Sequence, residues 1–99
     1  PFDTFGFALL QCMIAQRLGV KPGIYTHSIS NAHIYDNHYA GANEIISRTN
    51  DHKNIELHLP ENTFKRAEAK DEELVGEILR DLQAQYNPLP PIDGLEIAL

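Results

Sequence analysis

The sequence of 99 residues has no tryptophan, one cysteine and only eight lysine and arginine residues. A lone cysteine cannot form an intramolecular disulfide bond, which fits a protein of the reducing cytoplasm. Fourteen acidic residues give a formal net charge of −6, and the basic residues are scattered rather than clustered. Because nucleic-acid binding needs clustered lysine and arginine at the phosphates, we expect no nucleic-acid partner.

Long apolar runs are missing as well. No stretch reaches membrane-spanning length and no segment has the pattern of a signal peptide, so we expect no membrane partner and a cytoplasmic location. A chain this short forms one small domain or a piece of a larger one, and its core is modest. We therefore expect residues 1–99 to form a single domain.

The sequence also lacks the Cys/His spacing of a zinc site. His27, His33 and His38 could suggest a metal cluster, but the neighbouring Ser and Asn side chains favour hydrogen bonding, and we predict no metal. Cys12 falls on an apolar stripe, where cysteine most often serves as a small hydrophobe rather than as a nucleophile.

Apolar periodicity predicts three helices and two strands. Residues 4–18 place apolar side chains almost all round a helix, which indicates a buried element central to a core. Residues 24–35 are rich in β-branched and aromatic side chains and predict one long strand, and residues 55–59 alternate as a short one. Two further helices are expected over residues 37–49 and 68–85, the second of them amphipathic.

These elements predict an α/β (α+β) fold class, in which the buried central helix and the further helices pack on a twisted mixed sheet. Residues 50–54 are expected to form a loop, and residues 95–99 a short apolar tail.

The stretch 30–38 is the strongest candidate for a binding site. Alternate residues of a strand point from the same face, so His33 and Tyr35 are expected side by side. Two neighbouring hydrogen-bonding side chains, with Asp3 at the start of the first helix, would make a small polar pocket that suits a hydroxylated ligand. The alternatives are a hydrated polar sheet face for His33 and Tyr35, and a plain helix N-cap for Asp3.

Three motifs follow one another at short range: Pro1-Phe2-Asp3-Thr4-Phe5-Gly6-Phe7-Ala8-Leu9-Leu10, Met13-Ile14-Ala15-Gln16 and His33-Ile34-Tyr35-Asp36-Asn37-His38. Together they resemble the C-terminal part of the thymidylate synthase family, in which a Pro-Phe-Asn segment opens a helix and a His-x-Tyr-x-Asn-His strand follows. The resemblance is close over residues 1–38 and returns at Pro90-Pro91-Ile92, whereas residues 61–86 depart from the family.

The resemblance implies a pyrimidine nucleoside monophosphate as substrate and 5,10-methylenetetrahydrofolate as the cofactor of the complete enzyme, a cytoplasmic homodimer. In the family, residues matching His33 and Tyr35 hold a sugar hydroxyl, and the residue matching Asp3 reads the base edge. The family's nucleophilic cysteine lies upstream of the matched part. We therefore expect the substrate-binding residues Asp3, His33 and Tyr35 here, but no catalytic residue.

Asp3 departs from the asparagine that thymidylate synthases carry at the matching position. An amide can donate to O4 and accept from N3–H of uracil, whereas cytosine reverses both requirements. A carboxyl group here is similar to the deoxycytidylate hydroxymethylase branch of the family. We therefore favour (deoxy)cytidylate hydroxymethylation, with thymidylate synthesis from dUMP as one alternative and a non-catalytic nucleotide-binding or structural module as another.

Overall fold

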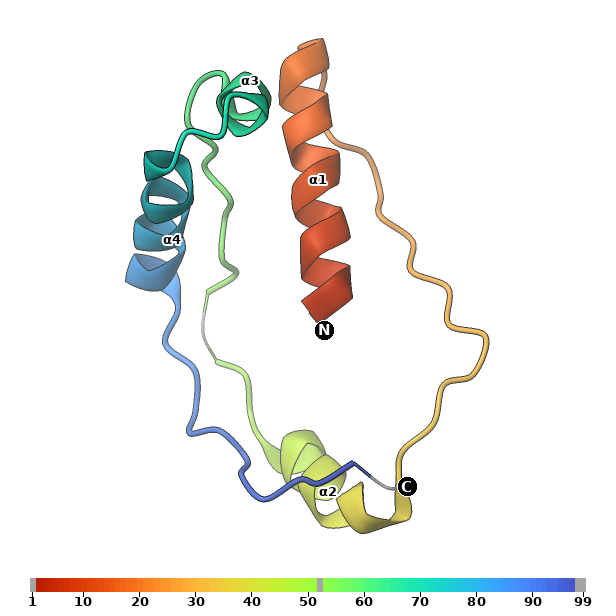
Figure 1. Cartoon of the computed structure of the whole chain (residues 1–99). Coiled ribbons are helices and arrows are strands. Elements are labelled where there is room, and N and C mark those ends of the chain that lie inside the picture. The colour runs from red at the N-terminus through yellow and green to blue at the C-terminus, as the bar shows by residue number, and fades with distance from the viewer. Residues whose placement is uncertain (1, 52, 98–99) are drawn as a thin grey trace. The chain divides into compact units, whose positions relative to one another are not determined.

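The computed structural model describes residues 2–51 and 53–97. Pro1 of the family motif, His52 of the predicted loop, and residues 98 and 99 of the predicted tail lie outside the described residues. Figure 1 shows the elements in chain order: α1 (Phe2–Leu18), the 3₁₀ helix η1 (Asp36–His38), α2 (Tyr39–Ser47), α3 (Thr63–Glu68) and α4 (Glu73–Gln85).

The predicted α/β fold class is wrong, because every regular element in the described residues is helical. Residues 24–35 and 55–59, the two predicted strands, contain no strand. A strand's backbone groups need a neighbouring strand to pair with. High β-propensity reports how well side chains fit a pleated surface and does not fix the backbone by itself. The predicted mixed sheet is therefore not part of the described structure.

The chain divides into two compact units. The first comprises the described residues up to Ser28 together with Ile55–Tyr86, and the second comprises Ile29–Asn54 with the described residues from Asn87 onward. The single domain over residues 1–99 stays a prediction. Within the part of the chain that the structure describes, no helix has the length and apolar character needed to cross a membrane.

Helix α1 is confirmed as a helix, but its predicted burial is wrong. Ala15 is its one buried residue, whereas Phe5 and Phe7 are 56% and 58% exposed. A helix that is apolar all round is buried only if neighbours pack on every side, and α3 is the one described helix that packs against it. Gly19 ends α1 as expected, with a positive φ of 68° that glycine adopts readily.

Helix α3 links α1 to α4 within the first unit, because it packs against both helices. The Gln16 side chain connects α1 to the start of α3, since its Nε2 donates to the Pro60 carbonyl (2.8 Å) and its Oε1 accepts the backbone N–H of Thr63 (3.2 Å). Thr63 is fully buried. Its hydroxyl also donates to the Pro60 carbonyl, so both the backbone N–H and the hydroxyl of this buried residue have acceptors.

The helix predicted over residues 68–85 is confirmed only from Glu73 onward, because a turn separates it from α3. Arg66 fixes this turn by donating from Nε to Asp71 Oδ2 at 2.7 Å and from Nη1 to Glu77. Asp71 also accepts the backbone N–H of Glu73 at 3.1 Å. A negative charge at this end of a helix is favoured by the helix dipole.

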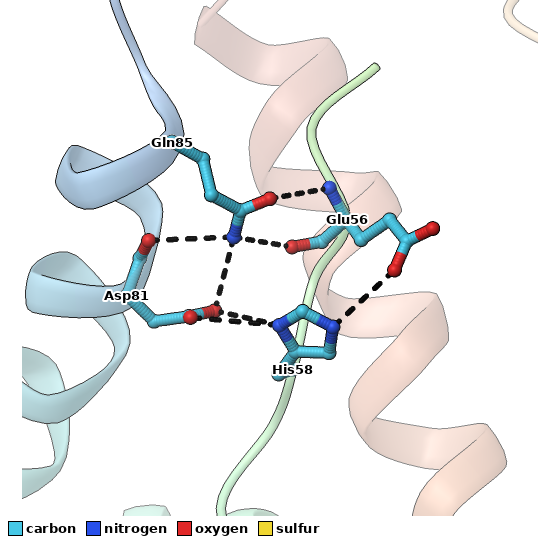
Figure 2. A network of polar contacts seen from close by, with 4 residues as sticks. All are labelled: Glu56, His58, Asp81 and Gln85. Carbon is cyan, nitrogen blue, oxygen red and sulfur yellow. Dashed lines mark hydrogen bonds and ion pairs between the residues drawn. The ribbon is translucent and has the colours of Figure 1, made fainter. Parts of the chain in front are cut away.

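The irregular segment 55–59 is fastened to α4 by the network in Figure 2. The Gln85 amide accepts the backbone N–H of Glu56 and donates to the Glu56 carbonyl, both at 2.9 Å. One side chain thus satisfies the two backbone groups that a neighbouring strand would otherwise pair. His58 lies between Asp81 (Nδ1–Oδ2 3.2 Å) and Glu56 (Nε2–Oε2 3.4 Å).

Candidate functional site

Three aromatic rings lie in a row in the second unit, just before and within η1. The ring centroids of His33 and Tyr35 are 5.4 Å apart, and those of Tyr35 and His38 are 5.2 Å apart. Tyr35 and His38 are half-buried, and His33 is exposed. The Tyr35 carbonyl accepts the backbone N–H of His38 at 2.9 Å, so the 3₁₀ turn itself brings the last two rings together.

His33 has its tautomer set by a backbone carbonyl. Its Nδ1 lies 2.7 Å from the Asn31 carbonyl oxygen, and a carbonyl can only accept, so Nδ1 carries the proton. In the neutral ring, Nε2 is then an acceptor. The neighbouring Tyr35 phenol can donate, so the pair can accept from and donate to one hydroxyl group of a ligand.

Asp3 lies in the first turn of α1 and is exposed. The helix begins at Phe2, before Asp3, so the carboxylate belongs to the first turn of the described helix rather than to its N-cap. Asp3 belongs to the first unit, whereas His33 and Tyr35 belong to the second. Of the three predicted site residues, only His33 and Tyr35 thus lie in the same unit.

Cys12 lies in α1 beside apolar neighbours. It lines a cavity of about 680 Å³ together with Phe5 and Leu9 of the same helix, Leu57 of the irregular segment and Leu82 of α4. These surroundings match the interpretation of Cys12 as a small hydrophobe. In residues 2–51 and 53–97, no group of three His, Cys, Asp or Glu side chains could hold a metal ion.

The C-terminal segment, residues 90–97, docks beside the three rings through hydrogen bonds that the sequence analysis did not predict. Asn37 Nδ2 (3.1 Å) and His38 Nε2 (2.6 Å) both bond to the Glu96 carbonyl. Arg48 Nη2 donates to the Pro90 carbonyl at 2.9 Å. Asn37 and His38 were visible in the motif, but their acceptor lies 58 and 59 residues away in the sequence, where no local pattern points to it.

Comparison with known proteins assigns the family. The family model described as thymidylate synthase matches residues 1–92. This chain belongs to the thymidylate synthase family. The family match also runs through residues 61–86, where the sequence motifs alone indicated a departure from the family. Members of the family are methyltransferases of nucleotide biosynthesis.

One curated relative is the thymidylate synthase of Clostridium beijerinckii, which is 47% identical over 51 residues. The matched region covers 52% of this chain and 19% of that thymidylate synthase. The matched region thus spans about a fifth of that relative's length. No solved structure matches the chain significantly.

Proposed function

We propose that this chain is the nucleotide-binding C-terminal part of a thymidylate synthase that converts dUMP to dTMP. The observation that carries the proposal is the His33–Tyr35 pair, which lies within the family motif with its rings 5.4 Å apart. The name of the Clostridium relative supports thymidylate synthesis over cytidylate hydroxymethylation.

The pair binds the sugar of the nucleotide. Because Nδ1 of His33 is committed to Asn31, its Nε2 accepts the proton of a sugar hydroxyl, and the Tyr35 phenol donates to the oxygen of the same group. A deoxynucleoside 5′-monophosphate has one free sugar hydroxyl, at the 3′ position. The pair therefore orients the sugar, and with it the base, by holding this single group from two sides.

The folate cofactor, 5,10-methylenetetrahydrofolate, supplies the one-carbon unit to the complete enzyme. Arg17 of α1 and Arg66 of α3 are each paired with a carboxylate, Arg17 with Glu68 at 3.7 Å and Arg66 with Asp71 at 2.7 Å, so neither is assigned to the anionic tail of the folate. We assign no residue of this chain to the folate.

The test is a nuclear magnetic resonance titration of the 99-residue chain with dUMP and with its 2′,3′-dideoxy analogue, which lacks the hydroxyl. We expect dUMP to bind about 2- to 10-fold more tightly, as one or two neutral hydrogen bonds would provide. His33→Ala should remove the difference. Equal affinities for the two ligands in the wild-type chain would contradict the proposal, and no binding of either would favour the non-catalytic structural module.

A second candidate function, deoxycytidylate hydroxymethylation, is favoured by Asp3 alone. An ionised carboxylate can accept from the exocyclic amine of cytosine but, unlike an asparagine amide, cannot donate to O4 of uracil. Each buried group that the wrong base leaves without a partner costs about 1–3 kcal/mol. Two such groups would change base preference about 100-fold or more.

The deciding measurement is kcat/KM for dUMP and dCMP in the complete enzyme that contains this chain, as wild type and as Asp3→Asn. A strong wild-type preference for dCMP that Asp3→Asn moves toward dUMP would establish the hydroxymethylase. A preference for dUMP in both proteins would leave thymidylate synthesis as the function and Asp3 as an acidic residue in the first turn of α1.

A further inference from the structure

His38 occupies a place that neither the family motif nor the proposed sugar contacts explain. Its ring packs against Tyr35 on one side, with centroids 5.2 Å apart. On the other side its Nε2 lies 2.6 Å from the Glu96 carbonyl. The imidazole therefore contacts both the His33–Tyr35 pair and the C-terminal segment, all within the second unit.

We propose that His38 is a positioning residue that couples the docked C-terminal segment, residues 90–97, to the orientation of the Tyr35 ring. The inference rests on the proposed function only for its consequence, which is that docking of the segment improves nucleotide binding. The coupling itself concerns contacts within the chain.

The hydrogen bond to Glu96 requires a proton on Nε2 of His38. The acceptor is a carbonyl, so Nε2 must carry the proton. This is the opposite tautomer to that of His33, whose Nδ1 bonds to Asn31. The two imidazoles flank Tyr35 with their protons set by different backbone carbonyls, so only the His38 tautomer depends on the C-terminal segment.

Further contacts hold the C-terminal segment against η1 and α2. Asn37 donates a second hydrogen bond to the Glu96 carbonyl, whose oxygen has two lone pairs. Gly41 is buried, and a Cβ atom there would lie 3.3 Å from Leu95 Cδ2 and 3.5 Å from Ile92 Cγ2. Glycine thus permits the segment to approach α2 closely.

Coupling follows from the rigidity of the imidazole. A planar ring held at Nε2 has a defined orientation toward Tyr35, and the interplanar angle of 50° is a tilted arrangement, which ring pairs favour over face-to-face stacking. When the segment leaves, Nε2 loses its acceptor, the ring turns more freely, and Tyr35 loses a fixed neighbour. The phenol is then less often oriented toward the ligand hydroxyl.

The experiment uses the 99-residue chain, the same chain truncated after Pro91, and each of these with His38→Phe, which keeps an aromatic ring but cannot donate a hydrogen bond. Nitrogen-15 resonances report the His38 tautomer, and the Tyr35 ring resonances report its environment. Ser47→Ala, on α2 but bonded to the Glu44 carbonyl, is the matched control and should leave both signals unchanged.

We expect truncation to shift the Tyr35 ring signals and to mix the His38 tautomers in the wild type. In the His38→Phe background the same truncation should move Tyr35 much less, because the link is already broken. For dUMP, truncation should weaken binding about 2- to 10-fold in the wild type and little in His38→Phe. If the truncated chain fails to fold, Leu95→Asp displaces the segment in the full-length chain and the same comparison applies.

Tyr35 signals that ignore truncation, or that respond equally in both backgrounds, would overturn the role of His38. This outcome is independent of the proposed function. If Tyr35 responds as expected but dUMP does not bind, the nucleotide assignment fails while the coupling stands.

Discussion

Single hydrogen bonds decide what the residues of the candidate site can recognise. His33 offers an acceptor to a ligand because its Nδ1–H donates to the Asn31 carbonyl, which leaves Nε2 without a proton in the neutral ring. Tyr35 offers a hydroxyl donor on a neighbouring ring, whose centroid lies 5.4 Å from the centroid of the His33 ring. Neither property is visible from residue type alone, because a neutral histidine can adopt either tautomer.

Removing the phenol tests the donor half of this pair. We expect Tyr35→Phe to raise the dissociation constant for dUMP about 2- to 10-fold, because one neutral hydrogen bond contributes about 0.5–1.5 kcal/mol. The measurement is a titration followed by nuclear magnetic resonance. Tyr39→Phe makes the same change at the start of α2 and should leave the affinity unchanged. If Tyr35→Phe binds dUMP as the wild type does, Tyr35 is part of a hydrated surface.

The lowered pKa of Asp71 predicts how the stability of the protein depends on pH. The hydrogen bond from Arg66, and then the backbone N–H of Glu73, hold the pKa of Asp71 below its usual range. A carboxyl group whose pKa is lowered by folding stabilises the protein above its unfolded pKa, and this contribution is lost as the pH falls through the folded pKa. Arg66 stays charged throughout, because its two carboxylate partners raise its pKa further.

We therefore expect the free energy of unfolding in urea to fall as the pH drops below about 4, the ordinary range of aspartate. Asp71→Asn should be less stable at neutral pH and show a shallower fall. Glu72→Gln, which removes an adjacent negative charge outside the Arg66 cluster, is the matched control and should keep the wild-type slope. Parallel curves for wild type and Asp71→Asn would mean that the cluster adds nothing to stability.

At the scale of elements, helices formed where the sequence pattern predicted them, but strands did not. A helix satisfies its backbone internally, so the apolar period of α1 and α4 was enough to predict it. The segment 55–59 shows what replaces a missing strand partner, because Gln85 pairs with both backbone groups of Glu56. Its alternating pattern predicted a strand, which was wrong, because the pattern does not say what the backbone will pair with.

Gly76 and Gly41, two of the three glycines in the described helices, should respond differently to alanine. Glycine inside a helix costs about 0.5–1 kcal/mol relative to alanine. At Gly76 in α4, a Cβ would meet only Arg80 Nη1, at 3.4 Å, the end of a flexible side chain. Gly76→Ala should therefore raise the free energy of unfolding by about that amount, as measured by urea denaturation.

Gly41→Ala in α2 provides the comparison. There the new Cβ would lie 3.3 Å from Leu95 Cδ2 and also close to Ile92, so the gain in helix propensity is offset by the displaced C-terminal segment. We expect a smaller gain or a loss at Gly41. Equal gains at the two glycines would indicate that Leu95 moves away at little cost.

For the molecule as a whole, the exposed apolar surface is the main departure from expectation. Ala15, Leu74 and Ile78 are the buried apolar residues in the described part of the chain. A core this small gives little stabilisation against the entropy lost on folding. The sequence pattern of α1 does not say what covers its apolar faces, so it predicted burial where the described chain leaves every residue of the helix except Ala15 at least partly exposed.

The proposed function assigns catalysis to the complete protein. We expect the 99-residue chain to produce no dTMP from dUMP and 5,10-methylenetetrahydrofolate, because the family's nucleophilic cysteine lies upstream of the matched part and Cys12 sits among apolar neighbours. Chromatographic detection of dTMP is the measurement, with the Clostridium thymidylate synthase as positive control. Formation of dTMP by the chain alone would require another nucleophile, which Cys12→Ser would test.

The amino-acid sequence by itself determined the family and the positions of α1, α2 and α4. It also predicted that His33 and Tyr35 lie side by side, although the strand on which that prediction rested does not form. These depend on residue identity and on contacts a few positions apart, where periodicity and motif spacing carry the information. Only the tertiary structure decided that residues 24–35 form no strand, which faces of α1 stay exposed, and that Glu96 reaches Asn37 and His38. These outcomes depend on partners far along the chain, and whether a distant partner is present is not encoded in any local pattern.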